Sequence, residues 1–170
     1  MSRWAVPGMT GLFCGLLQHG LYARLEGHLT AAWPSYAAVT LGWLLGGLAG
    51  LCSEGRPRVT VWLLAGAAAA DAICGSLLSA YPARVGFLPV YGLLAAVGGA
   101  FASSFLRGWR PLAGSVAHVM LWENNGFILG FTLSMLGGLV WGDAFLDVAP
   151  KAAALPLAAV LWRASGSKGS

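Results

Sequence analysis

The residues best placed to do chemistry are two acids, Asp71 and Glu123, each near the middle of a long apolar stretch. A charged side chain at the centre of a bilayer costs on the order of 2.5–3.5 kcal/mol by insertion scales, so something must compensate it. Neither apolar stretch contains a Lys or Arg. Hydrogen bonding, protonation or a bound cation therefore remain as ways to accommodate the two carboxylates, and a proton-coupled or cation-accepting carrier would need such groups.

Other polar side chains within apolar segments could assist the two acids. On the segment 113–141, Glu123 is separated by steps of three or four residues from Gly126 and Gly130, so it shares their helix face, while His118 and Asn125 lie seven residues apart on another face. We predict a polar cavity between helices over 5–23, 59–80 and 113–141, with these candidate solute-binding residues: Asp71, Glu123, Asn125, His118 and Gln18, with His19 beside them. The alternative is that these groups form interhelical hydrogen bonds that only fix packing.

The composition is that of an integral membrane protein. Of 170 residues, 58% are hydrophobic and only 9% are charged, whereas a soluble domain carries about 25% charged residues. The mean hydropathy is +0.73. The net charge of +4 is small for so apolar a chain, and no basic patch with interleaved aromatic residues indicates nucleic-acid binding.

Apolar runs of roughly 20 residues, the length that spans a bilayer, recur along the chain. They predict six spans, over about 5–23, 31–52, 59–80, 87–106, 113–141 and 145–162. The last is the weakest, because Asp147, Pro150, Lys151 and Pro156 interrupt it, and its first part could lie at the membrane interface. We predict one six-helix transmembrane domain over residues 1–164 and a disordered tail over 165–170.

Basic residues predict the orientation. With the N-terminus in the cytoplasm, the inner side holds seven basic residues and the outer side three; the seven are Arg3, Arg56, Arg58, Arg107, Arg110, Arg163 and Lys168, and the three are Arg24, Arg84 and Lys151. This distribution follows the positive-inside rule. It predicts a multi-pass protein of a bacterial-type inner membrane, with both termini cytoplasmic.

Glycines at four-residue spacing predict where helices pack closely. Gly42, Gly46 and Gly50 lie on one face of the second span, and Gly126 and Gly130 lie on one face of the fifth. Faces without side chains let a neighbouring backbone approach. We expect the glycines of the second span to form the contact surface of an oligomer.

Three stretches carry a family resemblance. MTGLFCGLLQHGLYARLEGHL, LGWLLGGLAGLCSEGRPR and VMLWENNGFILGFTLSMLGG resemble the membrane part of spermidine-synthase-like proteins, in which six or more major-facilitator-like helices precede a soluble aminopropyltransferase-like domain. Gly126 and Gly130 match that family's Gly-x-x-x-Gly pair, whereas Glu123 departs from its Asn, which Asn124 could equally represent. The soluble domain is absent from this sequence, so no polyamine-synthesis chemistry is transferred.

Enzyme and metal signatures are missing from the sequence. The three cysteines form no CxxC pair, the three histidines lack ligand spacing, and neither an HExxH motif nor a nucleophile elbow occurs. Asp71 and Asp143 could suggest a paired-aspartate membrane protease, but Asp143 lacks the surrounding glycine pattern. We expect no enzyme and assign no cofactor, while a metal or haem site formed between helices stays open.

These observations predict an all-α integral membrane protein whose six helices resemble one half of a major facilitator. The expected function is a small-solute or cation carrier acting as a dimer or within a complex. The alternative is a non-catalytic subunit that anchors or assembles a larger membrane complex. Expected partners are membrane lipid and a second copy or other membrane subunits, with no nucleic acid.

Overall fold

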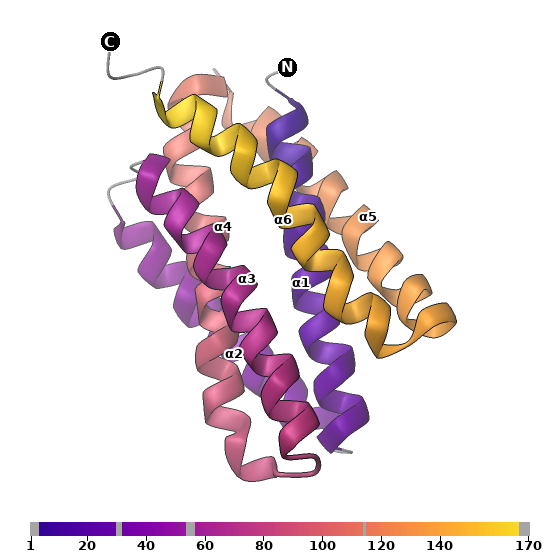
Figure 1. The fold of residues 1–170 in the computed structure, drawn as a ribbon. Coiled ribbons are helices and arrows are strands. Elements are labelled where there is room, and N and C mark those ends of the chain that lie inside the picture. Colours follow the sequence, from indigo (N-terminus) through magenta and orange to yellow (C-terminus); the bar gives the residue numbers. More distant parts are fainter. Residues whose placement is uncertain (1–3, 30–31, 54–56, 114, 167–170) are drawn as a thin grey trace.

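The computed structural model describes residues 4–29, 32–53, 57–113 and 115–166. Within these ranges the chain is all-helical, with no strand. The elements are α1 (Ala5–Leu29), α2 (Ala32–Cys52), α3 (Pro57–Ala80), the short 3-10 helix η1 (Val85–Phe87), α4 (Leu88–Ala113), α5 (Val116–Trp141) and α6 (Asp143–Gly166). The α-helices alternate in direction, so the two ends of the chain lie at the same end of the bundle (Figure 1).

Four of the described helices are long and apolar enough to cross a membrane: α2, α3, α4 and α6. This supports a multi-pass membrane protein. Each of the six predicted spans corresponds to one helix. Helices α1 and α5, which carry Gln18, His19, His118 and Asn125, are not among these four long apolar helices of the described chain. Helix α6, whose span was the weakest prediction, is one of the four, and it continues without a break through Pro150 and Pro156. It ends at Gly166, two residues into the predicted tail, and residues 167–170 lie outside the described part of the chain.

Helices α2 and α4 pack backbone to backbone. A Cβ added to Gly42, Gly46 or Gly50 would collide with a main-chain carbonyl oxygen of α4, contributed by Gly92, Ala96 and Ala100 in turn. The missing side chains therefore set the distance between these two helices. The oligomer contact predicted for the glycines of α2 is wrong in this respect, because α4 of the same chain covers that face.

Helices α1 and α5 form a second pair of this kind. Gly11 and Gly15 of α1 face main-chain atoms of Glu123 and Phe127, and the glycines of α5, Gly126 and Gly130, face the carbonyl oxygens of Gly8 and Leu12. The contact is reciprocal, since each helix supplies glycines against the other's carbonyl groups. Two tightly joined pairs, α1–α5 and α2–α4, thus form the frame of the bundle.

The apolar core joins the two pairs, and the outer faces remain apolar. Phe13 of α1 meets Phe101 of α4 edge to face, with ring centroids 5.5 Å apart, and both side chains are fully buried. The outer face of α2 carries exposed leucines, among them Leu41, Leu44 and Leu48. Apolar side chains on both the inner and outer faces are typical of a helix that contacts lipid.

Candidate functional site

The site begins with Arg24, which lies inside the bundle. The predicted first span ended at residue 23 with Arg24 on the outer side of the membrane, but α1 continues as a helix to Leu29, and only 3% of the Arg24 side chain is exposed. Its Nε donates a hydrogen bond to the carbonyl oxygen of Gly20 at 3.3 Å, so the side chain extends back along α1. A buried guanidinium is strongly unfavourable without a partner, and its partner comes from α3.

Asp71 of α3 is fully buried and accepts a hydrogen bond from Arg24 Nη2, which makes the two an ion pair. Its second oxygen, Oδ2, lies 3.2 Å from the Nζ of Lys151 on α6. The prediction that no membrane-embedded basic residue compensates Asp71 is therefore wrong. Arg24 and Lys151 belong to helices beside α3, and the sequence map had assigned both to the outer side.

Asp147 completes the network from α6. Its Oδ1 lies 2.5 Å from Lys151 Nζ, one helical turn away, and 3.6 Å from Arg24 Nη1. Two acids and two bases from three helices thus alternate, and their formal charges cancel. Pairing of this kind offsets the desolvation of buried charges only when the geometry is close, and three helices hold it here.

A second ion pair joins α1 to α6, one helical turn after Arg24 on α1 and one helical turn before Asp147 on α6. His28 Nε2 and Asp143 Oδ2 are 2.9 Å apart. This pair is more open to solvent, since 65% of Asp143 is exposed, against 3% of Arg24. The charged groups therefore run from the buried Arg24–Asp71 pair to the accessible His28–Asp143 pair.

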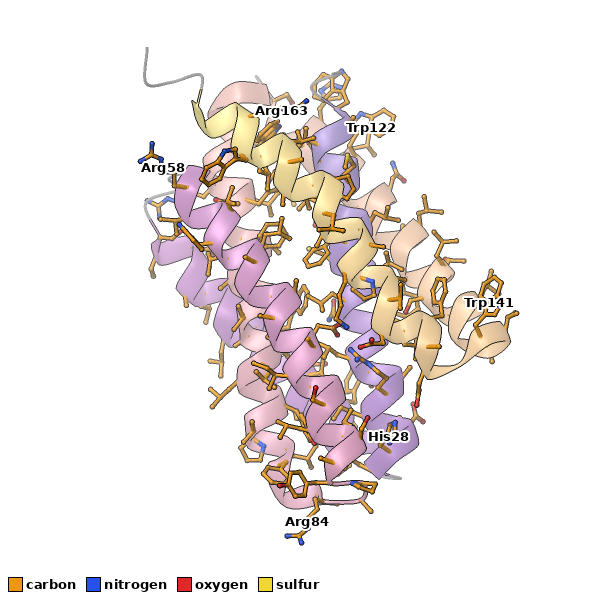
Figure 2. All side chains as sticks on the ribbon, in the orientation of Figure 1. His28, Arg58, Arg84, Trp122, Trp141 and Arg163 are labelled. Atoms are coloured by element: carbon orange, nitrogen blue, oxygen red, sulfur yellow. The ribbon has the colours of Figure 1, made fainter. Side chains whose placement is uncertain are left out.

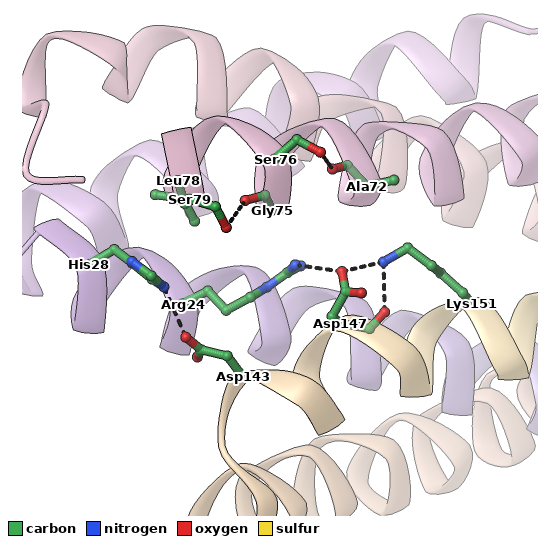
Figure 3. Close-up of a pocket in the computed structure, with 10 residues that line it drawn as sticks. All are labelled: Arg24, His28, Ala72, Gly75, Ser76, Leu78, Ser79, Asp143, Asp147 and Lys151. Carbon is green, nitrogen blue, oxygen red and sulfur yellow. Dashed lines mark hydrogen bonds and ion pairs between the residues drawn. The ribbon is translucent and has the colours of Figure 1, made fainter. Parts of the chain in front are cut away.

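A cavity of about 410 Å³ follows this row of charges. Figure 3 shows Arg24, His28, Asp143, Asp147 and Lys151 on one side and the α3 residues on the other. The α3 lining is formed by Ala72, Gly75, Ser76, Leu78 and Ser79. Arg24 is one of the lining residues; its buried Nη1 makes no hydrogen bond among the described residues but lies 3.6 Å from Asp147 Oδ1, within ion-pair distance. The site therefore combines a buried donor, exposed carboxylates and room for a small molecule.

Glu123 lies elsewhere. Its main-chain carbonyl contacts Gly11 of α1, and its side chain is half-buried. The Arg24–Asp71 pair lies near Gly20, which is nine residues along α1, a distance of about 14 Å at the helical rise. Glu123 is not among the residues that line the charged cavity. The structure thus does not bring the two acids to one site.

The remaining predicted site residues are also outside this cavity. Gln18 is half-buried on α1, whereas His118 and Asn125 are exposed on α5. The ring of His118 lies 5.3 Å from that of Trp4, and Asn125 lines an otherwise apolar groove of about 490 Å³ between α1 and α5. His19, expected to assist the acids, instead places its Nδ1 3.0 Å from Ser134 Oγ of α5.

The sequence did contain a signal for the residues that were missed. Arg24 and His28 are four residues apart, and Asp143, Asp147 and Lys151 follow one another at four-residue steps. Such spacing places each set on a single helix face. The two bases on the first helix and the two acids on the last indicate that these faces pack against each other, with Lys151 at the far end of the acidic face. The predicted span limits instead left Arg24 outside the first span and Lys151 in the interfacial part of the last.

No protein-family model, curated protein or solved structure matches this chain. Function must therefore be inferred from the residues and their arrangement. Within the described ranges, no three His, Cys, Asp or Glu side chains are grouped so that they could hold a metal ion. The feature with the clearest chemical potential is the charged cavity between α1, α3 and α6.

Proposed function

We propose that this membrane protein is a carrier of a small polar solute. The observation that carries the proposal is the row of charged side chains beside a cavity, with Asp71 and Arg24 buried and Asp143 and Asp147 accessible. Ionisable groups between membrane helices commonly mark solute or proton pathways. A network that served packing alone would have no need of an adjoining cavity.

The structure alters one part of the sequence-based expectation. A bound cation was one way to accommodate an uncompensated Asp71, but Arg24 and Lys151 already compensate it. A simple inorganic cation is therefore a weaker candidate than a solute that can replace one of these ion pairs. A proton pathway also remains within the proposal, because His28 and Asp143 lie at the accessible end.

We further propose that the six helices correspond to one half of a major facilitator, as the resemblance to spermidine-synthase-like membrane domains implies. Two such halves would enclose a full path, so the carrier would act as a dimer or within a complex. The contact surface cannot be the glycine face of α2, which α4 covers. The apolar groove between α1 and α5, with Asn125 at its edge, is the better candidate.

The proposed orientation keeps both termini on the cytoplasmic side of a bacterial-type inner membrane. Arg24 and Lys151, two of the three basic residues assigned to the outside, belong to ion pairs. In Figure 2, Arg58 and Arg163 lie at the opposite end of the bundle from Arg84. With the paired residues set aside, the outer side retains only Arg84 against seven inner basic residues, a sharper bias of the kind that orients membrane proteins.

A second function, as an anchoring or assembly subunit, is favoured by a different observation. The polar side chains of His118 and Asn125 are exposed on α5 beside the apolar groove. Polar groups on a membrane helix often hydrogen-bond to a neighbouring helix. In this alternative, α5 docks a different membrane protein, and the charged network only fixes the bundle.

Two measurements separate these functions. Purified protein in liposomes should take up a solute from a labelled panel of amino acids, sugars and inorganic cations, and Asp147→Asn should lower that uptake while Glu26→Gln, an exposed change outside the cavity, should not. Mass measurement of the protein ejected directly from native membranes should give a homo-oligomer. A stoichiometric complex with a different membrane protein, together with no uptake, would contradict the carrier function and support the anchoring role.

A further inference from the structure

A cleft of about 440 Å³ lies between α2, α4 and α5, away from the charged cavity. Arg107 is the charged residue of its lining, and the other five side chains are apolar. The lining consists of Leu51 of α2, Leu106 and Arg107 of α4, and Val116, Val119 and Met120 of α5. Helices α2 and α4 form one glycine-joined pair and α5 belongs to the other, so the cleft lies where the two pairs meet.

The guanidinium of Arg107 is held in place but its charge is not neutralised. Its Nη1 donates a hydrogen bond to the carbonyl oxygen of Leu51, in the last turn of α2. The ion pairs among the described residues involve only Arg24, His28 and Lys151 as bases, so no described acid pairs with Arg107. A guanidinium has five N–H donors, and the Leu51 carbonyl accepts from one of them. The exposed side chain therefore offers a positive charge and further donors at the cleft.

The cleft lies at the level where the membrane-crossing segments end. The apolar segments that contain α2 and α4 end one residue past Leu51 and two residues past Arg107. Basic side chains near the ends of membrane helices reach the headgroup level of the bilayer. Leu51, Val116 and Met120 are exposed apolar side chains, so the wall of the cleft is continuous with the lipid-facing surface.

This end of the bundle carries exposed positive charge. Arg84 directly precedes η1 and α4, whereas Arg107 lies near the opposite end of α4. In Figure 2, Arg58 and Arg163 also lie opposite Arg84, and both are exposed. It is the end that the proposed orientation places on the cytoplasmic side, where anionic lipid headgroups attract basic residues.

We infer that this cleft binds one anionic phospholipid, with its phosphate on Arg107 and an acyl chain along the apolar wall of α4 and α5. A soluble anion would meet Arg107 but would leave the apolar wall uncovered. A lipid without net charge would cover the wall but would leave the arginine charge without its counter-charge. Because the cleft is formed by both glycine-joined pairs, the bound lipid contacts both. Such binding is separate from the proposed carriage of a solute and does not depend on it.

The test is native mass spectrometry of the full chain, purified in a neutral detergent and titrated with two lipids. Dioleoylphosphatidylglycerol carries one negative charge, and dioleoylphosphatidylcholine has the same chains without net charge. We expect the first bound lipid to be phosphatidylglycerol, with an affinity about fivefold higher, as one arginine at an anionic membrane surface contributes. An excess of inorganic phosphate should not displace it. Equal affinities for the two lipids, displacement by phosphate, or a protein dimer that forms only when phosphatidylglycerol is absent would each overturn the inference.

Variants then locate the binding. Arg107→Gln should reduce the affinity for phosphatidylglycerol to that for phosphatidylcholine, and because Arg107 is exposed the variant should fold, which its melting temperature without lipid checks. Arg58→Gln removes the same charge from the same end of the bundle but outside the cleft, and it should keep the fivefold preference. An unchanged preference in Arg107→Gln, or an equal loss in Arg58→Gln, would refute the assignment to this cleft. The comparison of the two lipids on the unsubstituted chain needs no variant to fold.

Discussion

Removing the charge of Asp71 should destabilise the bundle far more than removing the charge of Asp147. Asp71 is fully buried and serves both Arg24 and Lys151, so Asp71→Asn leaves a buried guanidinium without its counter-charge. Breaking one partner of a buried ion pair costs about 3–5 kcal/mol. The asparagine oxygen still accepts a hydrogen bond, so we expect the lower end, about 3 kcal/mol, which lowers the melting temperature of a chain this size by roughly 6–12 °C.

The matched control removes the same charge from a more open position. Asp147 is 52% exposed, and its loss leaves both ion pairs of Asp71 in place, so Asp147→Asn should cost about 0–1 kcal/mol. Thermal unfolding in detergent can be followed through the eight tryptophans. Adding Arg24→Gln to Asp71→Asn should cost less than the sum of the single changes, because the two residues interact. Equal losses for Asp71→Asn and Asp147→Asn, or strict additivity with Arg24→Gln, would refute this reasoning.

Three further predictions concern other parts of the bundle. Gly46→Ala places a Cβ against a carbonyl group of α4 and should lower the free energy of unfolding by about 1–3 kcal/mol. Gly27→Ala, with open space around it, should be neutral or slightly stabilising. Equal effects of the two changes would show that the α2–α4 contact is not tight. Gly142 joins α5 to α6 at a φ of 62° and a ψ of −149°, a conformation nearly restricted to glycine, so Gly142→Ala should lower stability by about 1–3 kcal/mol through backbone strain. An unchanged melting temperature would contradict this. Asn125→Ala should weaken self-association or complex formation, measured as mass in native membranes, without changing the melting temperature of the isolated chain; an unchanged mass distribution would remove the α1–α5 groove as a contact surface.

The helices and their close contacts could be read from the sequence because both depend on local spacing. Apolar runs near 20 residues located α2 and α3 to within two residues and the start of α4 to within one, whereas α4 continues to Ala113, seven residues past its predicted end at 106. The four-residue glycine spacing of Gly42, Gly46 and Gly50 indicated a face without side chains, and that face does meet another backbone. Spacing could not identify the neighbour, since the same face would fit α4 or a second copy of the chain.

The charged site could be predicted only in part. Ala67, Gly75 and Ser79 lie at four-residue steps from Asp71, a spacing that predicts an inward direction for its side chain, and Asp71 is fully buried. Its partners were missed, because hydropathy alone ends a predicted span at the first charges and so placed Arg24 outside the membrane. Whether a charge at the end of a span leaves the bundle or turns back into it depends on the facing helices. For Arg24 these are α3, which supplies Asp71, and α6, which supplies Asp147, and both come later in the chain than α1.

The two glycine-joined pairs also bear on how the bundle can move. Carbonyl groups packed against glycine resist sliding, so α1–α5 and α2–α4 behave as two stiff units, with α6 beside the first and α3 beside the second. Asp71 comes from one unit, and its partners Arg24 and Lys151 come from the other. Rotation of one unit against the other therefore has to separate these charges, so the ion pairs stabilise the arrangement of the two units seen in the structure. A solute that supplies its own charges at this seam would lower the cost of this rotation.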